Sequence, residues 1–282
     1  MALADSIPGV SGGTIAFIMG FYDQLIQSVD DLIHGNKQER LKAIKFISKL
    51  AVGWGVGIIL SVLFIASIFE SHIYQISSLF LGLILAAIPL IIKQEKVVLK
   101  NNYVHVIFSL IGILVVVLIS YFNPFVQSGS SVNLELTSNI QYLYILFAGM
   151  IAISAMILPG ISGSTVLLIL GLYQLIISSI DQFLRFNFTV LPILIFFGIG
   201  VLLGILITIR LVNYALIHYR SQTIHTIVGL MIGSLFAVVV GPMTIDPLMD
   251  PLRISNFSII YFIFGGVLIF GLEYMRNKLE KN

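Results

Sequence analysis

The chain contains the stretch Pro8-Gly9-Val10-Ser11-Gly12-Gly13-Thr14 and repeats it 151 residues later as Pro159-Gly160-Ile161-Ser162-Gly163-Ser164-Thr165. The likeness continues past this motif, and over residues 8–30 eleven of twenty-three positions are identical at the same offset. Apolar composition alone could supply the matching Ile residues, but not the ordered Pro, Gly, Ser and Tyr. We interpret the pair as an internal duplication. Paired apolar segments interrupted by Gly and Pro are typical of transporter binding sites.

The composition indicates a protein that is embedded in lipid. Of the 282 residues, 58% are hydrophobic and 10% are charged, and the mean hydropathy is +1.06. Ordinary soluble domains are about 25% charged, so a soluble fold of this length could not cover so much apolar surface. The absence of Cys excludes disulfides and thiolate metal sites. We therefore expect a polytopic membrane protein whose surroundings are the bilayer, with no metal, cofactor or nucleic-acid partner.

The duplication divides the chain into two predicted repeats. The first covers residues 1–122, an external connector covers 123–139, and the second repeat covers 140–282. Each repeat is predicted to hold a hairpin with a motif at its tip, at 8–14 and 159–165, followed by three spans. Basic residues and apolar residues at helical spacing predict an interfacial helix at 36–50. The six spans are predicted at residues 50–69, 76–92, 103–122, 189–209, 223–241 and 257–275.

The two hairpins differ in length before their motifs. An apolar segment at 140–158 precedes the second motif, whereas only residues 1–7 precede the first. We therefore expect the natural chain to begin upstream of Met1, so that the first hairpin is incomplete in this sequence.

The distribution of Lys and Arg predicts the orientation. Thirteen of these residues lie in segments 34–49, 93–102, 210–221 and 276–282, whereas the intervening loops hold only Arg185 and Arg253. Positive residues gather on the cytoplasmic side of membrane proteins. We expect a multi-pass protein of the cytoplasmic membrane with a cytoplasmic C-terminus.

The same charge pattern predicts that each hairpin returns to the side from which it starts. Three spans after each hairpin give two repeats of inverted topology, and the motifs then enter from opposite sides. Charge does not decide whether a hairpin stops inside the bilayer or crosses it twice. The Pro and Gly residues favour a break inside, because such backbone must be buried in protein or face water. The predicted fold is all-α, with two inverted repeats that each combine a re-entrant helical hairpin and three transmembrane helices.

The tips carry the residue types that bind anions. Helices that begin at Ser11 and Ser162 would direct free backbone N–H groups at the break, Gly permits close approach, and hydroxyls add donors. The candidate phosphate-binding residues are Ser11, Gly12, Gly13, Thr14, Ser162, Gly163, Ser164 and Thr165. The hairpin breaks are assigned to Pro8, Gly9, Pro159 and Gly160. In the alternative interpretation, the two Ser only cap their helices and the Gly only allow tight packing.

Four further residues are candidates for an accessory role. Tyr22 and Tyr173 are equivalent in the duplication and could bind headgroup oxygens or act as interface anchors. Arg185 follows the second hairpin and could attract an anion or remain solvated. Asp23 is equivalent to Gln174 in the duplication, so it has no acidic counterpart, and it is a candidate proton carrier.

Three pairs of Gly residues are spaced so that neighbouring helices can pack closely. They are Gly53/Gly57, Gly200/Gly204 and Gly229/Gly233. We expect these residues to have a structural role.

The motifs resemble those of a known family. Asp5-Ser6-Ile7 before the first motif, Gly20-Phe21-Tyr22 after it, and the second motif with Gly171 and Tyr173 are similar to the signature of bacterial and archaeal polyprenyl-phosphate transporters. The resemblance covers essentially the whole chain, although members usually have an apolar segment before the first motif. It implies recycling of undecaprenyl phosphate, the lipid carrier of cell-wall precursors, from the outer to the inner leaflet.

A membrane enzyme and an anion channel are two other classes of function to consider for this sequence. A membrane phosphatase would need a base beside a nucleophile, and the five His lie scattered at span ends without catalytic or metal-ligand spacing; we therefore expect no enzyme activity. A channel or exchanger for a small anion remains the alternative, because donor-rich tips would also suit an ion.

Overall fold

The computed structural model describes residues 1, 11–60, 72–100, 103–121, 139–244 and 249–279. All regular secondary structure in these residues is helical. The chain is thus an all-helical membrane protein, as the composition predicted. Within the described ranges, four helical segments are long and apolar enough to cross a bilayer, namely Ile73–Gln94, Ile140–Ile157, Phe188–His218 and Arg220–Met243.

Among the described residues of the first half, two short helices joined by a tight turn come first. Its α-helices are α2 (Gly12–Ile18), α3 (Tyr22–His34), α4 (Lys37–Leu60), α6 (Ile73–Gln94), α7 (Lys96–Lys100) and α8 (Val106–Tyr121), with the 3-10 helix η2 at Tyr103–His105. No break separates the basic stretch from the start of the first predicted span, because both lie in α4. The remainder of that span lies outside the described residues.

In the second half, a long helix precedes two shorter ones that are equivalent to α2 and α3. Its α-helices are α9 (Asn139–Ile157), α10 (Gly163–Ile169), α11 (Tyr173–Leu184), α12 (Leu191–His218), α13 (Arg220–Val240) and α14 (Ile259–Leu279), with 3-10 helices η4 (Phe188–Val190) and η5 (Gly241–Thr244). The helices α12, α13 and α14 coincide with the last three predicted spans. However, α12 extends nine residues beyond the predicted end at residue 209.

The duplication extends to the local backbone. The helices α2 and α10 both have seven residues and begin at equivalent positions. Two residues after the end of each helix lies a Gly in the left-handed region, where φ is 75° at Gly20 and 68° at Gly171. The next helix begins at Tyr22 in one copy and at Tyr173 in the other. The two motifs therefore fold into the same helix–turn–helix unit.

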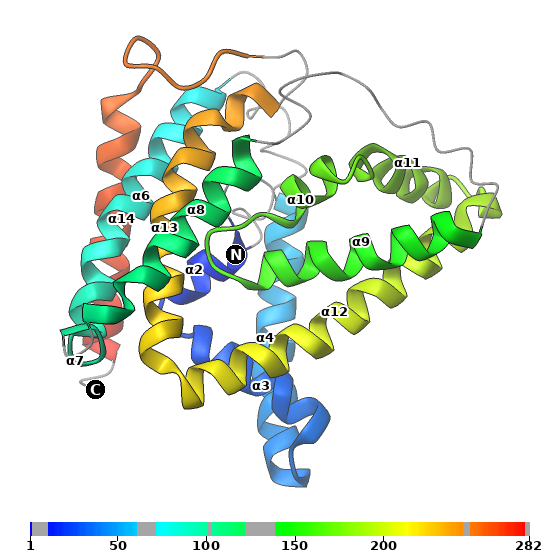
Figure 1. Cartoon of the computed structure of the whole chain (residues 1–282), viewed down its shortest axis with the longest axis horizontal. Coiled ribbons are helices and arrows are strands. Elements are labelled where there is room, and N and C mark those ends of the chain that lie inside the picture. The colour runs from blue at the N-terminus through cyan, green and yellow to red at the C-terminus, as the bar shows by residue number, and fades with distance from the viewer. Residues whose placement is uncertain (2–10, 61–71, 101–102, 122–138, 245–248, 280–282) are drawn as a thin grey trace.

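Long helices pack in three extensive pairs, α8 with α13, α9 with α12, and α6 with α14. Figure 1 shows α9 and α12 extending together away from the group of α6, α8, α13 and α14. Gly residues allow the close approach: a Cβ at Gly229 would collide with Ser109 of α8, and one at Gly200 with Leu146 of α9. The predicted packing role is confirmed for these pairs, whereas Gly53 on α4 faces open space.

The interior is centred on α13. Its residues Ile224, Ile227 and Met231 are almost fully buried against the start of the chain and α6. In contrast, α12 presents large apolar side chains outward, such as Leu202 and Leu211, which are 63% and 65% exposed. A long helix with such an apolar outer surface is stable in lipid and not in water.

Candidate functional site

The first motif caps its own helix. Ser11 has an extended backbone, with φ −125° and ψ 151°, and its Oγ accepts a hydrogen bond of 3.2 Å from the backbone N–H of Thr14. The Thr14 hydroxyl lies 3.1 Å from the same Oγ. Ser11, Gly12, Gly13 and Thr14 are all buried. Ser11 therefore caps α2.

Ser162 of the second motif has a backbone conformation similar to that of Ser11 but a different hydrogen-bond pattern. Ser162 is extended, with φ −96° and ψ 129°, yet its hydroxyl does not cap α10. It lies 2.7 Å from the Ser164 hydroxyl. Thr165 is 8% exposed, and its hydroxyl makes no hydrogen bond within the described residues. Capping alone therefore does not explain the polar side chains of the second motif.

The two motifs are in direct contact through a chain of hydrogen bonds. The Gly160 N–H donates to Thr14 Oγ1 over 2.8 Å, and the Ser11 hydroxyl donates to the Leu158 carbonyl over 3.3 Å. Since each hydroxyl has one proton, the Thr14 hydroxyl is left to donate to Ser11 Oγ. The order is Gly160 N–H to Thr14, Thr14 to Ser11, and Ser11 to Leu158. The structure therefore brings residues of the two motifs together.

Pro159 and Gly160 lie between the end of one helix and the start of the next. The helix α9 ends at Ile157, α10 begins at Gly163, and the two helices pack together. Gly160 has φ 94°, and a Cβ there would lie 2.5 Å from the Leu230 carbonyl oxygen of α13. Only Gly fits such a position. The equivalent residues Pro8 and Gly9 lie outside the described part of the chain.

The accessory residues have different positions. The Tyr22 hydroxyl is buried and donates to the Ile157 carbonyl over 3.2 Å, so the phenol supports the contact between the motifs. Tyr173 is partly buried at the start of α11, and Arg185 is exposed beyond the end of that helix. The structure does not bring Arg185 to the contact between Thr14 and Gly160.

Sequence reasoning missed an ion-pair network that holds Asp23. Arg220 lies at the start of α13, and its guanidinium donates to Asp23 over 2.8 Å through Nη1. It also binds both carboxylate oxygens of Glu95 at the end of α6, through Nη2 and Nε. Charge counting assigned Arg220 to topology alone. The signal that could have found the network is Glu95, an acid within an otherwise basic segment.

A polar cavity of about 280 Å³ adjoins this network. Asp23, Gln27 and Asp31 of α3 line it together with Asn213 of α12 and Arg220. Asp31 lies outside the candidate spans, and its partial burial, together with the Glu39 and Asp30 carboxylates, raises the pKa of its carboxyl. The cavity therefore presents acidic, amide and guanidinium groups within a mainly apolar protein.

Metal chemistry has no support in the described ranges, because they contain no group of three His, Cys, Asp or Glu residues that could hold an ion. The site is built from hydroxyls and backbone amides. Such groups bind anions through donated hydrogen bonds.

A family model and curated relatives match the chain. The model of a family described as "Undecaprenyl phosphate translocase-like" matches residues 1–253. A polyprenyl-phosphate transporter of Staphylococcus aureus (strain NCTC 8325 / PS 47) is 34% identical over 243 residues, which cover 86% of this chain and 83% of the relative. One of Vibrio cholerae serotype O1 (strain ATCC 39315 / El Tor Inaba N16961) is 32% identical over 245 residues, covering 83% and 73%. Both are named as transporters and not as enzymes. No solved structure matches the chain.

Proposed function

The chain belongs to the undecaprenyl phosphate translocase-like family, and we propose on this premise that it carries undecaprenyl phosphate across the cytoplasmic membrane. Transport from the outer to the inner leaflet would recycle the lipid carrier of cell-envelope synthesis. The headgroup of such a lipid cannot cross hydrocarbon unpaired, because an isolated charge there costs many kcal/mol. The isoprenoid chain can remain in lipid throughout. The protein therefore has to supply a polar route for the phosphate alone.

The observation that carries the proposal is the contact between the motifs. Gly160 N–H, the Thr14 hydroxyl and the Ser11 hydroxyl are three buried donors in a row. They bind one another and the Leu158 carbonyl through neutral hydrogen bonds. Charge-assisted bonds to a phosphate would be roughly twice as strong. A headgroup that enters between the motifs can thus replace these bonds with stronger ones.

The second motif supplies the other side of the proposed cradle. The Thr165 hydroxyl is buried without a hydrogen-bond partner in the described residues, and leaving a buried polar group unsatisfied costs about 1–3 kcal/mol. A phosphate oxygen would satisfy it. The Ser162 and Ser164 hydroxyls, which bind each other, add two donors that can turn to the same ligand. Gly13 and Gly163 instead allow close packing against α9, because a Cβ there would lie 2.7 Å from the Ile157 carbonyl oxygen and 2.9 Å from the Ala152 carbonyl oxygen, respectively.

Alternating access follows from the duplication. We assign each motif to the tip of a re-entrant hairpin, one from each side of the membrane, in two repeats of inverted topology with the C-terminus in the cytoplasm. The shared helix–turn–helix unit supports this assignment. Exposure of one tip and then the other would pass the phosphate between leaflets.

The proposal is tested by transbilayer movement of labelled undecaprenyl phosphate in proteoliposomes. We expect the wild-type chain to move the lipid and Ser11→Ala/Ser162→Ala to do so at least about tenfold more slowly, since two charge-assisted hydrogen bonds are lost. The matched control is Ser28→Ala/Ser179→Ala. It removes a second pair of Ser that are equivalent in the duplication and buried, but that lie outside the motifs.

The same experiment can contradict the proposal. Equal rates in the motif variant and the matched control would remove the tips from the mechanism. No movement above that of an inert membrane protein, combined with a flux of small anions through the folded chain, would support the channel or exchanger.

A further inference from the structure

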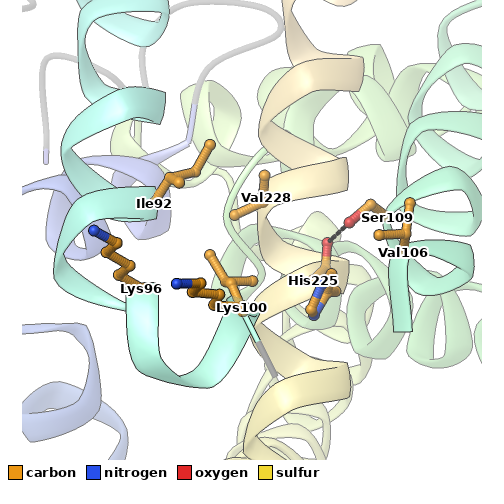
Figure 2. A pocket seen from close by; sticks show the side chains of 8 residues that line it. Ile92, Lys96, Lys100, Val106, Ser109, His225 and Val228 are labelled. Atoms are coloured by element: carbon orange, nitrogen blue, oxygen red, sulfur yellow. Dashed lines mark hydrogen bonds between the residues drawn. The ribbon is translucent and has the colours of Figure 1, made fainter. Parts of the chain in front are cut away.

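A groove that is separate from the motifs and from the polar cavity at Arg220 opens beside α7. It has a volume of about 330 Å³ and lies between the end of α6, α7, the start of α8 and α13. Figure 2 shows Lys96 and Lys100 on one side of it, with Ile92 and Val228 nearby and Ser109 and His225 on the other side. No residue of either motif is among those that line it.

Two cations line this groove. Lys96 and Lys100 are one helical turn apart on α7, and both are exposed. Neither forms an ion pair with a carboxylate in the part of the chain that the structure describes. The neighbouring acid, Glu95, is bound on both oxygens by Arg220. The two ammonium groups are therefore available to an anion from outside.

The wall of the groove is apolar. Aliphatic surface next to the two Lys comes from Ile92, Leu99, Val106 and Val228. Of these side chains, Ile92 is 43% exposed and Val106 is 45% exposed. From Val106 the exposed apolar surface continues along α8 through Ile107 and Leu110. The groove thus joins a pair of cations at a helix end to the hydrocarbon-facing side of a helix.

Polar contacts hold the far wall in place. Ser109 donates to the His225 carbonyl over 2.8 Å, as the dashed line in Figure 2 marks. The His225 ring is 5% exposed, and its Nδ1 donates to the Ser221 carbonyl over 2.7 Å. The first contact fixes α8 against α13, and the second holds the His225 ring against its own helix. The groove is therefore shaped before any ligand arrives.

We propose that this groove binds one anionic glycerophospholipid, with its phosphate at Lys96 and Lys100 and one acyl chain along Ile92, Leu99, Val106 and Val228. Basic pockets between helices on the cytoplasmic side suit such headgroups, and the Lys-rich end of the bundle is the side that we expect in the cytoplasm. The bound lipid would link α6 and α7 to α8 and α13. This proposal does not depend on the transported substrate, because the motifs take no part in it.

The test uses native mass spectrometry of the full chain in detergent, titrated with phosphatidylglycerol. We expect one retained lipid on the wild-type chain and at least about tenfold weaker retention in Lys96→Ala/Lys100→Ala, because each Lys near an anionic lipid contributes on the order of a fivefold change in affinity. The matched control, Lys42→Ala/Lys45→Ala, removes the same charge from exposed positions of α4 and should retain the lipid. Zwitterionic phosphatidylcholine should not be retained by any variant.

A second variant separates shape from charge. Val106→Trp places a large side chain in the groove from a half-exposed position and keeps both Lys, so it should also lose the lipid. Retention of phosphatidylglycerol by the Trp variant, or equal retention by both Lys variants, would overturn the proposal. Stoichiometric displacement of phosphatidylglycerol by undecaprenyl phosphate would also overturn it, since the groove would then belong to the transported lipid.

Discussion

The Thr14 hydroxyl oxygen accepts a 2.8 Å hydrogen bond from the backbone N–H of Gly160, although 146 residues separate the two. Both residues are buried, and each belongs to a different copy of the duplicated motif. The bond therefore joins the first repeat to the second at the position where the sequence repeats itself.

Removal of this acceptor should destabilise the protein. In Thr14→Val the shape is retained but the buried Gly160 N–H loses its partner, which costs about 1–3 kcal/mol. Thr14→Ser keeps the hydroxyl and should recover most of that loss. Unfolding in detergent measures the difference, with Thr223→Val as a control that removes a hydroxyl bonded to its own helix at Tyr219. Equal stability of the Val and Ser variants at position 14 would contradict the role of the bond.

Gly160→Ala should destabilise the protein more than the addition of one methyl group suggests. The residue would have to hold φ near 94° and place its Cβ 2.5 Å from the Leu230 carbonyl oxygen. The left-handed conformation alone costs about 1–2 kcal/mol. We expect a lower melting temperature and a loss of the contact with Thr14. Gly53→Ala is the control, because its Cβ meets nothing within 4 Å and Ala favours a helix; a control as unstable as Gly160→Ala would refute the argument.

The α8–α13 contact should depend on Gly229. A methyl group there collides with the backbone of Ser109, which cannot move away without separating the helices. Gly229→Ala should therefore reduce the folded yield and the melting temperature, whereas Gly198→Ala, which faces open space on α12, should leave both unchanged. Size-exclusion chromatography and thermal unfolding in one detergent compare the two variants. Equal behaviour would show that the helix pair tolerates a wider spacing.

The two acids bound by Arg220 should contribute unequally. Glu95 is 19% exposed and binds with both oxygens, whereas Asp23 is 48% exposed and binds with one. We expect Asp23→Asn to cost less than about 1 kcal/mol, as solvated pairs do, and Glu95→Gln to cost about 1–2 kcal/mol because a two-point bond is lost. Unfolding at 0.1 M and 1 M salt tests this order. Salt should weaken the Asp23 contribution more, and the reverse order would show that exposure does not govern the network.

The sequence revealed the parts of the fold that depend on local residue types. The break at Pro159 and Gly160 and the all-helical class follow from chemistry that neighbouring residues carry themselves. The sequence did not distinguish Ser11 from Ser162, because the same residue caps one helix and binds Ser164 in the other. The first motif has Gly13 at the position of Ser164, so this hydroxyl partner is absent there, and the shared pattern does not indicate which bond each Ser makes.

The sequence pattern also did not predict which residues far apart in the chain contact each other. Gly53 has the spacing of Gly200, yet only Gly200 meets another helix, since spacing gives a small ridge but no partner. Arg220 and Asp23 are 197 residues apart. Counting charges by segment indicates the side of the membrane and not the atom to which each charge binds.

The first turn of α3 has a mechanical consequence. Tyr22 and Asp23 are consecutive, yet Tyr22 binds the end of α9 at Ile157 and Asp23 binds Arg220 at the start of α13. Because one turn of a hydrogen-bonded helix is stiff, rotation of α3 strains both bonds together. The hydrogen bond from Tyr22 to Ile157 and the ion pair between Asp23 and Arg220 are thereby mechanically coupled. Neither bond can lengthen far unless the other also breaks or the first turn of α3 unwinds.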